Sequence, residues 1–264
     1  MSTKTKIIAV ANQKGGVGKT TTTINLGTAL AAIHKKVLIV DLDSQGNAST
    51  GLGLSRSDRC PGSYDVLLGL VPLEEGVKKT KIPQLFLLPS DVRLSGAEVE
   101  LVHAEDREFY LRKALHSSFY DYILIDCPPA LSLLTVNAFS SAHSVLVPLQ
   151  CEYYALEGIT QLFKTIDVIK KRLNPSLIVE GIVLTMFDKR NALSHSVEND
   201  VREHFKEKVY KTIIPRNVRI SEAPSYGMPV MIYDMHCQGA RSYLELAKEF
   251  IQSQKSGEKN DKEE

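Results

Sequence analysis

The fold of this chain is decided by Gln13-Lys14-Gly15-Gly16-Val17-Gly18-Lys19-Thr20, eight residues that join an apolar strand-like segment to a helix-like one. The strand-like segment is Ile7-Ile8-Ala9-Val10-Ala11, and the helix-like segment includes Ile24 to Leu30. Glycines in such a turn allow backbone N–H groups to face phosphate oxygens, and the positive end of the following helix dipole faces the same anions. The stretch therefore predicts a phosphate-binding loop.

The loop differs from the common P-loop pattern at its first position. That pattern has glycine where Gln13 stands, and it has no counterpart of the additional lysine, Lys14. Lys19 is expected to reach the β- and γ-phosphates, and Thr20 to hold Mg²⁺ through its hydroxyl. Glycine-rich turns between a strand and a helix also arise for purely geometric reasons, but the two flanking segments favour nucleotide binding.

The composition is typical of a globular α/β protein. With 264 residues and 43% hydrophobic content, the chain can form one large core. We expect a single domain over 1–252 and a polar, disordered tail over 253–264. The cysteines have no C-x-x-C spacing, and no signal peptide or membrane-length apolar run is recognisable. These features predict a cytoplasmic protein without membrane contact, and a net charge of +1 limits nucleic-acid binding to a local basic patch.

Apolar runs rich in Val, Ile and Leu alternate along the chain with stretches of helical periodicity. Continuous apolar runs are typical of strands buried on both faces, and we predict strands at 6–12, 37–42, 85–89, 121–126, 144–149 and 177–186. Helical periodicity is clearest at Glu98–Leu115, Ala155–Leu173, Ser196–Val209 and Gly239–Gln252. This alternation predicts an α/β fold with a doubly wound, mostly parallel sheet and helices on both faces. Ligands of such sheets bind beyond the carboxyl ends of the strands.

Two of the predicted strands end in aspartates. The strand at 37–42 leads into Asp41 and Asp43, and the strand at 121–126 ends at Asp126. Asp43 lies further beyond its strand than Asp41, so we expect Asp43 to orient or deprotonate an attacking water. Asp126 suits coordination of Mg²⁺ or its waters, as in a Walker B motif. Such aspartates can instead cap helices, but their combination with the loop favours a metal–nucleotide site.

Five motifs together resemble the ParA/Soj chromosome-partitioning ATPases, which have a deviant Walker A loop within the P-loop NTPase fold. The resemblance extends from about Lys6 to Phe250. The motifs are Lys14-Gly15-Gly16-Val17-Gly18-Lys19-Thr20, Asp41-Leu42-Asp43-Ser44-Gln45-Gly46-Asn47, Ile125-Asp126-Cys127-Pro128-Pro129, Cys151-Glu152-Tyr153-Tyr154-Ala155-Leu156-Glu157-Gly158 and Ile214-Pro215-Arg216-Asn217-Val218-Arg219-Ile220-Ser221-Glu222-Ala223-Pro224. The first two occur across the wider deviant-Walker group, whereas the last two are similar to the chromosomal Soj branch.

The resemblance implies further roles. Lys14 is the signature lysine, which crosses a sandwich dimer to reach the ATP phosphates of the other subunit, much as an arginine finger does. The resemblance also places Pro215, Arg216 and Asn217 around the adenine. Together with the arguments above, the predicted catalytic residues are Lys14, Lys19 and Asp43, and the predicted metal-binding residues are Thr20, Asp43 and Asp126. The predicted nucleotide-binding residues are Lys14, Gly15, Gly16, Val17, Gly18, Lys19, Thr20, Thr21, Pro215, Arg216 and Asn217.

The activity implied by the resemblance is a switch driven by ATP and Mg²⁺. ATP binding closes a homodimer, the dimer binds double-stranded DNA nonspecifically, and a ParB/Spo-type partner stimulates hydrolysis and release. Arg190 and Arg219 match positions where the family places arginines for DNA, and arginine forks bind phosphate oxygens whatever the base sequence. For Arg219 an ion pair with Glu222 is the alternative. The protein is then expected in the cytoplasm, in association with the nucleoid.

Two segments depart from the family pattern. Ser44 stands where relatives commonly have proline, which predicts a looser loop after Asp43 and a different turnover rate. Residues 234–238 lack the basic residues that the family often carries there, which argues for a smaller DNA surface. Lys189, next to Arg190, partly compensates for this loss.

Three other functions are compatible with a nucleotide-binding fold. A MinD-like cell-division ATPase would end in a basic amphipathic helix that inserts into a membrane, whereas 253–258 offer no apolar face. An iron protein of the electron-transfer type would bridge a dimer with cysteines, but two prolines follow Cys127, which favours a buried, inert thiol. A scaffold with a vestigial site is disfavoured because the lysines and aspartates of the site are all present.

Overall fold

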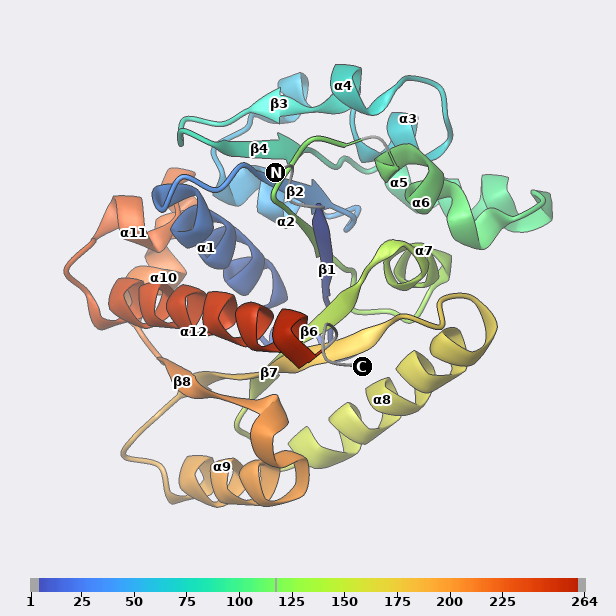
Figure 1. Ribbon diagram of the computed structural model, residues 1–264. Helices are drawn as coiled ribbons and strands as arrows, with labels where there is room; N and C mark the ends of the chain where they lie inside the picture. The colour runs from blue at the N-terminus through green and yellow to red at the C-terminus, as the bar shows by residue number, and fades with distance from the viewer. Residues whose placement is uncertain (1–4, 117, 261–264) are drawn as a thin grey trace.

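The structure is a computed structural model that describes residues 5–116 and 118–260, and within this part of the chain eight strands form one central sheet. The strands are β1 Lys6–Val10, β2 Val37–Asp41, β3 Lys78–Lys79, β4 Leu85–Leu88, β5 Tyr122–Asp126, β6 Ser144–Gln150, β7 Ile178–Phe187 and β8 Val209–Pro215. Their order is β3-β4-β2-β5-β1-β6-β7-β8, and β3 is antiparallel to β4 while the other neighbours are parallel (Figure 1). The predicted doubly wound, mostly parallel sheet is confirmed.

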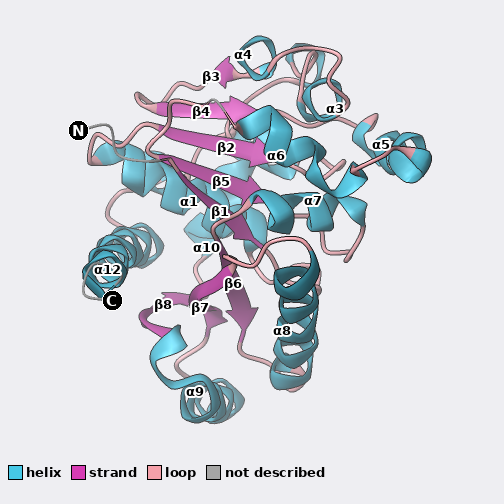
Figure 2. Ribbon diagram, turned by 45° about the vertical axis from the view of Figure 1, so that its right-hand side comes forward, coloured by secondary structure: helices cyan, strands magenta, loops and turns pink. Residues whose placement is uncertain are grey.

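Helices cover both faces of this sheet. They are α1 Lys19–Ala32, α2 Asn47–Gly51, α3 Ser63–Leu67, α4 Leu73–Gly76, α5 Leu94–Glu100, α6 Tyr110–Leu115, α7 Leu133–Ser141, α8 Ala155–Arg172, α9 Ala192–Phe205, α10 Val218–Glu222, α11 Val230–Tyr233 and α12 Gln238–Asn260. Figure 2 shows α1 and α12 on one face and α6, α7 and α8 on the other.

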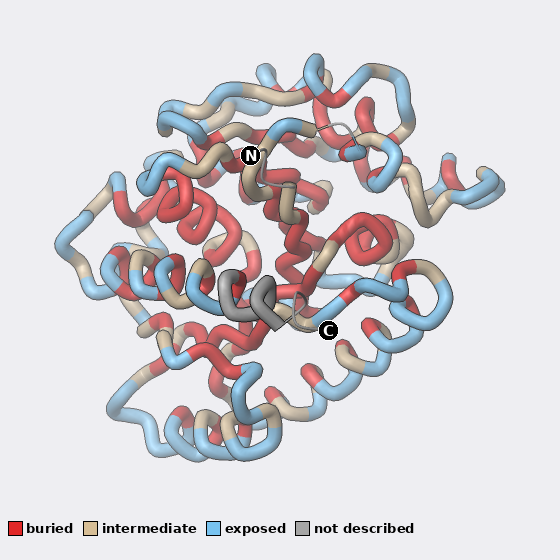
Figure 3. Tube along the Cα trace, viewed as in Figure 1, coloured by how far each residue is buried: buried red, intermediate tan, exposed pale blue. Residues whose placement is uncertain are grey.

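The central strand β1 explains why the sequence pattern is continuous rather than alternating. Ile7 and Ala9 belong to the core that includes α7 and α8, whereas Ile8 and Val10 belong to the core that includes α1 and α12. Figure 3 shows the strands buried between the two helical layers. Since both faces of each central strand are covered, almost every position in it is apolar.

The helix α1 lies close against the sheet because Gly27 has no side chain. A Cβ at Gly27 would lie 3.0 Å from Ile39 Cδ1 and 3.4 Å from Leu124 Cδ1. On its outer side α1 packs against α12, where Thr22 Oγ1 and Tyr243 OH are 3.3 Å apart. This packing fixes the start of α1, and with it the Gln13–Thr20 loop, at the carboxyl edge of the sheet.

Two predicted helices have the wrong boundaries. The predicted helix Glu98–Leu115 is α5 and α6, separated by the 3-10 helices Leu101–His103 and Arg107–Phe109. The break includes Asp106, whose φ of 53° is left-handed and cannot continue an α-helix. The predicted helix Ser196–Val209 ends at Phe205, because Lys206 has a φ of 48°. Val209 already begins the edge strand β8, which we did not predict.

The boundary predicted at Gln252 is also wrong, because α12 continues to Asn260. Gln254 is buried, and its Nε2 donates a hydrogen bond to Glu180 Oε1, so the helix still packs on the sheet beyond the predicted domain end. Glutamine, lysine and glutamate also favour a helix intrinsically. The last four residues of the predicted tail, 261–264, lie outside the described residues. Neither α12 nor any other described helix has both the length and the apolarity of a membrane span.

Candidate nucleotide site

The loop between β1 and α1 has the backbone that its glycines predict. Gly16 and Gly18 have φ values of 76° and 89°, in the left-handed region that favours glycine. Val17 is buried between them, and its carbonyl accepts a hydrogen bond of 2.8 Å from Thr185 Oγ1 on β7. The loop is therefore fixed to the sheet while its glycines face outward.

Lys19 is the first residue of α1, and only 7% of its surface is exposed. Its Nζ donates a hydrogen bond of 3.0 Å to the carbonyl of Lys14. Burial lowers the pKa of Lys19, while the nearby groups of Asp126, Cys127 and Asp43 act in the opposite direction. A buried ammonium that is bonded only to a carbonyl is suited to bind an anion. Burial removes water from the positive charge of Lys19, and a phosphate would compensate that charge.

Asp41 and Asp126 are register partners at the ends of the neighbouring strands β2 and β5. Both side chains are fully buried. Asp41 Oδ2 accepts hydrogen bonds of 2.8 and 2.7 Å from the backbone nitrogen and hydroxyl of Ser49. Burial raises the pKa of Asp41 to about 6, and the bonds from Ser49 limit that rise. Asp41 thus anchors α2, whereas Asp126 has fewer partners.

Asp126 Oδ1 accepts a hydrogen bond of 3.3 Å from Thr23 Oγ1, but Oδ2 is buried and has no hydrogen-bond partner among the described residues. Burial, followed by the charge of Asp41, raises the pKa of Asp126 to about 8, and the nearby Thr20 hydroxyl, which does not form a hydrogen bond of good geometry with Oδ2, limits that rise. A buried oxygen without a partner fits a site that a hydrated Mg²⁺ ion completes. The alternative of helix capping holds for Asp41, which accepts a bond from Ser49 N in the first turn of α2, whereas the bonds to Asp43 and Asp126 come from Gln45 N and Thr23 Oγ1.

The loop after Asp43 is held in place rather than loose. Gln45 N donates to Asp43 Oδ1 at 3.0 Å, and Gly46 N donates to the carbonyl of Asp43 at 2.9 Å. The carbonyl of Gly46 accepts a bond of 3.2 Å from Arg59 Nη1. These bonds hold the half-buried Asp43 carboxylate at the edge of a cavity.

A cavity of about 500 Å³ joins the phosphate loop to Asp43. The predicted site residues that line it are Gly15, Gly16, Gly18, Lys19, Thr20, Thr21 and Asp43. The predicted residues Pro215, Arg216 and Asn217 lie outside its walls: Pro215 ends β8, and Asn217 caps α10 by accepting a bond of 2.9 Å from Arg219 N. Most site residues named from the first two motifs thus come together, but Lys14, Val17 and the residues named for the adenine do not line this cavity.

The opposite wall of the cavity was missed by the sequence analysis. It comes from Ile220, Ala223, Pro224, Met228, Pro229 and Val230. This wall is tied to α1, because Val230 N donates a bond of 2.8 Å to Asn25 Oδ1. The available signal was the pair of prolines on either side of Gly227, which marks a fixed turn but does not by itself point to a ligand.

Lys14 lies outside the cavity walls and faces a different surface. Its ammonium forms an ion pair with Glu152 Oε1, and 51% of its side chain is exposed. Next to Glu152, Tyr153 and Tyr154 are 77% and 63% exposed, and their rings pack edge to face with centroids 5.0 Å apart. A Cβ at Gly15 would meet nothing within 4 Å. The phosphate loop therefore borders an exposed aromatic surface.

The two arginines predicted to contact DNA are exposed and ion-paired. Arg190 Nη2 lies 3.0 Å from Asp188 Oδ2, with 88% of the Arg190 side chain exposed. Arg219 Nη1 lies 2.9 Å from Glu222 Oε2, and its Nε lies 3.5 Å from Asp234 Oδ2. The ion pair that we kept as the alternative for Arg219 is therefore present. Ion pairs between exposed side chains are weak, so both arginines remain able to exchange a carboxylate for a phosphate.

The cysteines show no arrangement suited to a metal cluster. Cys127 and Cys151 are buried free thiols, and burial raises the pKa of both, that of Cys151 to about 12. A protonated thiol is a poor metal ligand. Within the described ranges, no group of three or more His, Cys, Asp or Glu is placed to hold a metal ion. A cation here would depend on phosphate oxygens and few protein oxygens, which is the usual mode for Mg²⁺.

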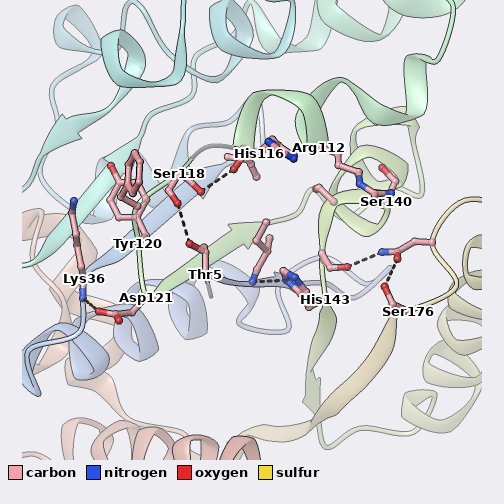
Figure 4. A pocket seen from close by; sticks show the side chains of 16 residues that line it. Thr5, Lys36, Arg112, His116, Ser118, Tyr120, Asp121, Ser140, His143 and Ser176 are labelled. Carbon is pink, nitrogen blue, oxygen red and sulfur yellow. Dashed lines mark hydrogen bonds between the residues drawn. The ribbon is translucent and has the colours of Figure 1, made fainter. Parts of the chain in front are cut away.

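A larger hollow, of about 840 Å³, lies at the opposite, amino edge of the sheet. Figure 4 shows its polar side chains bonded to one another and to the backbone. Asp121 Oδ2 accepts a bond of 2.7 Å from Lys36 N, and His143 Nδ1 accepts one of 3.0 Å from Ile7 N. The helix α7 ends near this hollow instead of beginning there, so its dipole disfavours a phosphate.

Comparisons with known proteins agree with this geometry. A family model described as an AAA domain matches residues 5–179. The chromosome partitioning protein ParA of Caulobacter vibrioides is 55% identical over 250 residues, which cover 93% of this chain and 94% of that protein. The sporulation initiation inhibitor protein Soj of Bacillus subtilis is 52% identical over 246 residues, which cover 92% of this chain and 97% of that protein.

Solved structures extend the comparison. Cobyrinic acid a,c-diamide synthase from Mycobacterium smegmatis, with a bound ATP analog and magnesium, has a TM-score of 0.84 and 36% identity and covers 96% of this chain and 97% of its own. The cell division ATPase MinD of Pyrococcus furiosus has a TM-score of 0.77 and 30% identity and covers 96% of this chain and 99% of its own.

Proposed function

We propose, since this chain belongs to the ParA/Soj family of chromosome-partitioning ATPases, that it is a DNA-partition switch driven by Mg·ATP. ATP binding closes a homodimer, the dimer binds double-stranded DNA without sequence preference, and hydrolysis stimulated by a ParB-type partner returns it to the monomer. The protein then acts in the cytoplasm, on the nucleoid.

One observation carries the proposal. Lys19, Thr20 and Asp43 line one cavity at the carboxyl edge of the sheet, and the partnerless Oδ2 of Asp126 lies within electrostatic reach of Lys19 and Asp43. A buried lysine and a buried carboxylate oxygen without a partner are both costly unless a ligand completes them. Perturbed titratable groups gathered at a cleft are typical of functional sites.

Each side chain has a distinct task in this site. The Lys19 ammonium binds the β- and γ-phosphate oxygens, and the N–H groups of the left-handed glycines bind the same phosphates. Thr20, Asp43 and Asp126 are the residues that would hold Mg²⁺, directly or through its waters. When bound, Mg²⁺ neutralises the charge that develops on the transferred phosphate. Asp43 accepts a hydrogen bond from the attacking water and so orients it.

The exposed surface beside the phosphate loop supports the dimer. Lys14 is held by Glu152 in the monomer, at the border of the exposed Tyr153 and Tyr154 rings. Exposed aromatic side chains are typical of protein interfaces. In the proposed dimer, Lys14 leaves Glu152 for the phosphates of the partner subunit, and the tyrosines are covered. The open space at Gly15 is what a close approach of two such loops requires.

The DNA contact is proposed for Arg190 and Arg219. Their carboxylate partners, Asp188 and Glu222, pair with them at the surface without burying them. The pKa of Asp188 is lowered to about 2, first by its bond with Arg190 and also by the charge of Arg216, so these three residues form one charged cluster. Binding through such a cluster depends strongly on salt, because each phosphate contact releases counterions.

The partition role is favoured over that of a MinD-type cell-division ATPase. The fold alone does not separate the two, since the MinD structure has a TM-score of 0.77 and a plasmid partition protein of Borrelia burgdorferi has one of 0.75. Identity separates them: the partitioning ParA is 55% identical to this chain, whereas that MinD is 30% identical.

The proposal is tested by the variant Asp43→Ala, with Asp167→Ala on the exposed face of α8 as the matched control. We expect ATP turnover to fall by at least about 100-fold in Asp43→Ala, because the attacking water loses its acceptor. ATP binding should persist, so size-exclusion chromatography with light scattering should show a stable dimer in ATP. Normal turnover in Asp43→Ala would remove the assignment of this residue, and turnover lost equally in the control would point to a folding defect.

A further inference from the structure

Arg59, in the segment between α2 and α3, is a buried arginine close to the nucleotide site. Only 4% of its surface is exposed, and it lies outside the walls of the nucleotide cavity. Its Nη1 donates to the carbonyls of Gly46 and Ser90 at 3.2 and 3.4 Å. Its Nη2 donates to Thr50 Oγ1 at 2.8 Å and to the carbonyl of Leu54 at 3.2 Å. The guanidinium therefore ties α2 and its flanking loops to the segment that follows β4.

Stability alone does not explain an arginine at this position. Among the described residues, no carboxylate forms an ion pair with the guanidinium of Arg59, and its Nε is buried without a hydrogen-bond partner. Burial lowers the pKa of Arg59, and the nearby charge of Asp41 opposes that effect. Burial of a cation among neutral oxygens costs free energy, and such groups often add little net stability. The geometry that Arg59 imposes on its neighbours is the better explanation.

The segment that Arg59 holds carries Asp43. The residues of this segment that line the nucleotide cavity are Asp43, Gln45, Asn47 and Thr50. Gly46 connects Arg59 to Asp43, because its carbonyl accepts the bond from Arg59 and its nitrogen donates a bond of 2.9 Å to the carbonyl of Asp43. The position of the Asp43 carboxylate in the cavity therefore depends on a guanidinium that does not itself reach the cavity.

Direct packing of Arg59 on the backbone of Gly46 strengthens this dependence. Gly46 has a φ of 62°, and a Cβ there would overlap Arg59 Nη1 and lie 2.8 Å from the carbonyl oxygen of Ser90. Movement of Gly46 toward Arg59 is blocked by this contact, whereas movement away from it breaks the hydrogen bond. The guanidinium thus fixes the loop after Asp43 in both directions.

We propose that Arg59 is a positioning residue for ATP hydrolysis. Through Gly46 and Thr50, its guanidinium holds the segment 43–50 so that the Asp43 carboxylate faces the attacking water. Lysine cannot take this role, because a single ammonium cannot bond the separate oxygens that the planar guanidinium reaches. A displacement of about 1 Å at a reacting group can cost about 100-fold in rate, so a small shift of Asp43 is sufficient to slow the reaction. The proposal rests on the proposed function, since Arg59 acts only through Asp43.

The first test is the variant Arg59→Lys, with Arg56→Lys at an exposed position of the same segment as the matched control. Steady-state turnover should show kcat lowered by about 10-fold in Arg59→Lys, with KM for ATP within about twofold, and no change in the control. Circular dichroism checks the fold at the assay temperature. If Arg59→Lys does not fold, Arg59→Gln, which removes the buried charge, is measured with the same expectation. An unchanged kcat, with or without a raised KM, would overturn the proposal.

A double-mutant cycle with Asp43→Ala separates positioning from a general structural role. If Arg59 acts through Asp43, the double variant Asp43→Ala, Arg59→Lys should hydrolyse ATP within about twofold of the rate of Asp43→Ala alone. A further loss of about 10-fold in the double variant would show that Arg59 acts elsewhere, and would overturn the proposal. Slow turnover in Asp43→Ala beside a normal kcat in Arg59→Lys would refute the role of Arg59 and leave the proposed function intact. Normal turnover in Asp43→Ala would contradict both.

Discussion

The two edges of the sheet offer hollows of opposite character. The hollow at the amino edge is larger, about 840 Å³ against about 500 Å³, yet its buried amide and hydroxyl groups are hydrogen-bonded within the protein. At the carboxyl edge, Lys19 is buried on a carbonyl, and Asp126 keeps an oxygen without a partner among the described residues. The comparison teaches that incomplete buried charge, rather than the size of a hollow, marks the site of a ligand.

The largest expected difference between the edges concerns a lysine at each. Lys19→Ala should lower ATP turnover by at least about 100-fold, because the phosphates lose their buried cation. Lys36→Ala, which removes an ammonium 4.9 Å from the Tyr120 ring centroid in the larger hollow, should leave turnover within about twofold. Steady-state hydrolysis measured on both variants checks the contrast, and a Lys36→Ala defect as severe as that of Lys19→Ala would reverse it.

The second difference concerns assembly at the carboxyl edge. Gly15→Val should leave the monomer folded, since a Cβ there meets nothing within 4 Å, and should leave ATP binding nearly unchanged. The added side chain should block the dimer, because two loops can no longer approach each other. Light scattering in ATP, with ATP binding followed in parallel by fluorescence, measures both. A Gly15→Val dimer as abundant as that of the unchanged chain would contradict the placement of the interface.

The third prediction concerns Asp126 at the carboxyl edge and the dependence of the protein's stability on pH. Since the folded-state pKa of Asp126 is raised to about 8, above an unfolded value near 4, its burial destabilises the protein increasingly as the pH rises from about 4 to 8. Asp126→Asn should remove this cost and stabilise the nucleotide-free protein at pH 8 by an amount on the order of a few kcal/mol. Denaturant unfolding at pH 5.5 and 8 checks the sign. An equal loss of stability with pH in the variant would assign the effect to other groups, with Asp41 the first candidate.

The smallest effect on the reaction is expected from a change at the amino edge, where the buried polar groups are hydrogen-bonded within the protein. Asn174 Nδ2 donates to the carbonyls of Phe139 and Ala142 at 2.9 and 2.7 Å. Asn174→Ala should therefore destabilise the fold by about 1–3 kcal/mol, because two buried carbonyls lose their donor. Turnover at a temperature where the variant is folded should not change. A specific loss of turnover there would show that the amino edge takes part in the reaction.

The sequence was sufficient where local pattern and tertiary structure demand the same residues. The central strands are covered on both faces, so their apolar runs were recognisable, and the left-handed turns at Gly16 and Gly18 require glycine. The edge strand β8 was not predicted, because it pairs with β7 alone and its sequence therefore lacks a continuous apolar run. Its backbone N–H groups at Lys211 and Thr212 are bonded to the Glu249 carboxylate of α12, at 2.7 and 2.9 Å, instead of to a further strand. No local pattern reveals that arrangement.

Part of the wall of the carboxyl-edge cavity could be anticipated from the sequence for a similar reason. Lys19, Thr20, Thr21 and Asp43 line the cavity because fixed motifs place them there. The wall from Ile220 to Val230 consists of ordinary apolar residues and prolines, and only the tertiary fold brings them to the phosphate loop. The ion pair between Lys14 and Glu152 likewise joins residues 138 positions apart, which spacing alone cannot show.

In the proposed switch, occupation of the carboxyl-edge site controls DNA binding. It is tested most directly by retention of the protein on nonspecific double-stranded DNA, with and without Mg·ATP, across a salt series. Arg190→Glu and Arg219→Glu serve as the variants at the proposed DNA surface. We expect retention in ATP that weakens steeply with salt, little retention without ATP, and loss in either variant. Equal retention with and without ATP would contradict it.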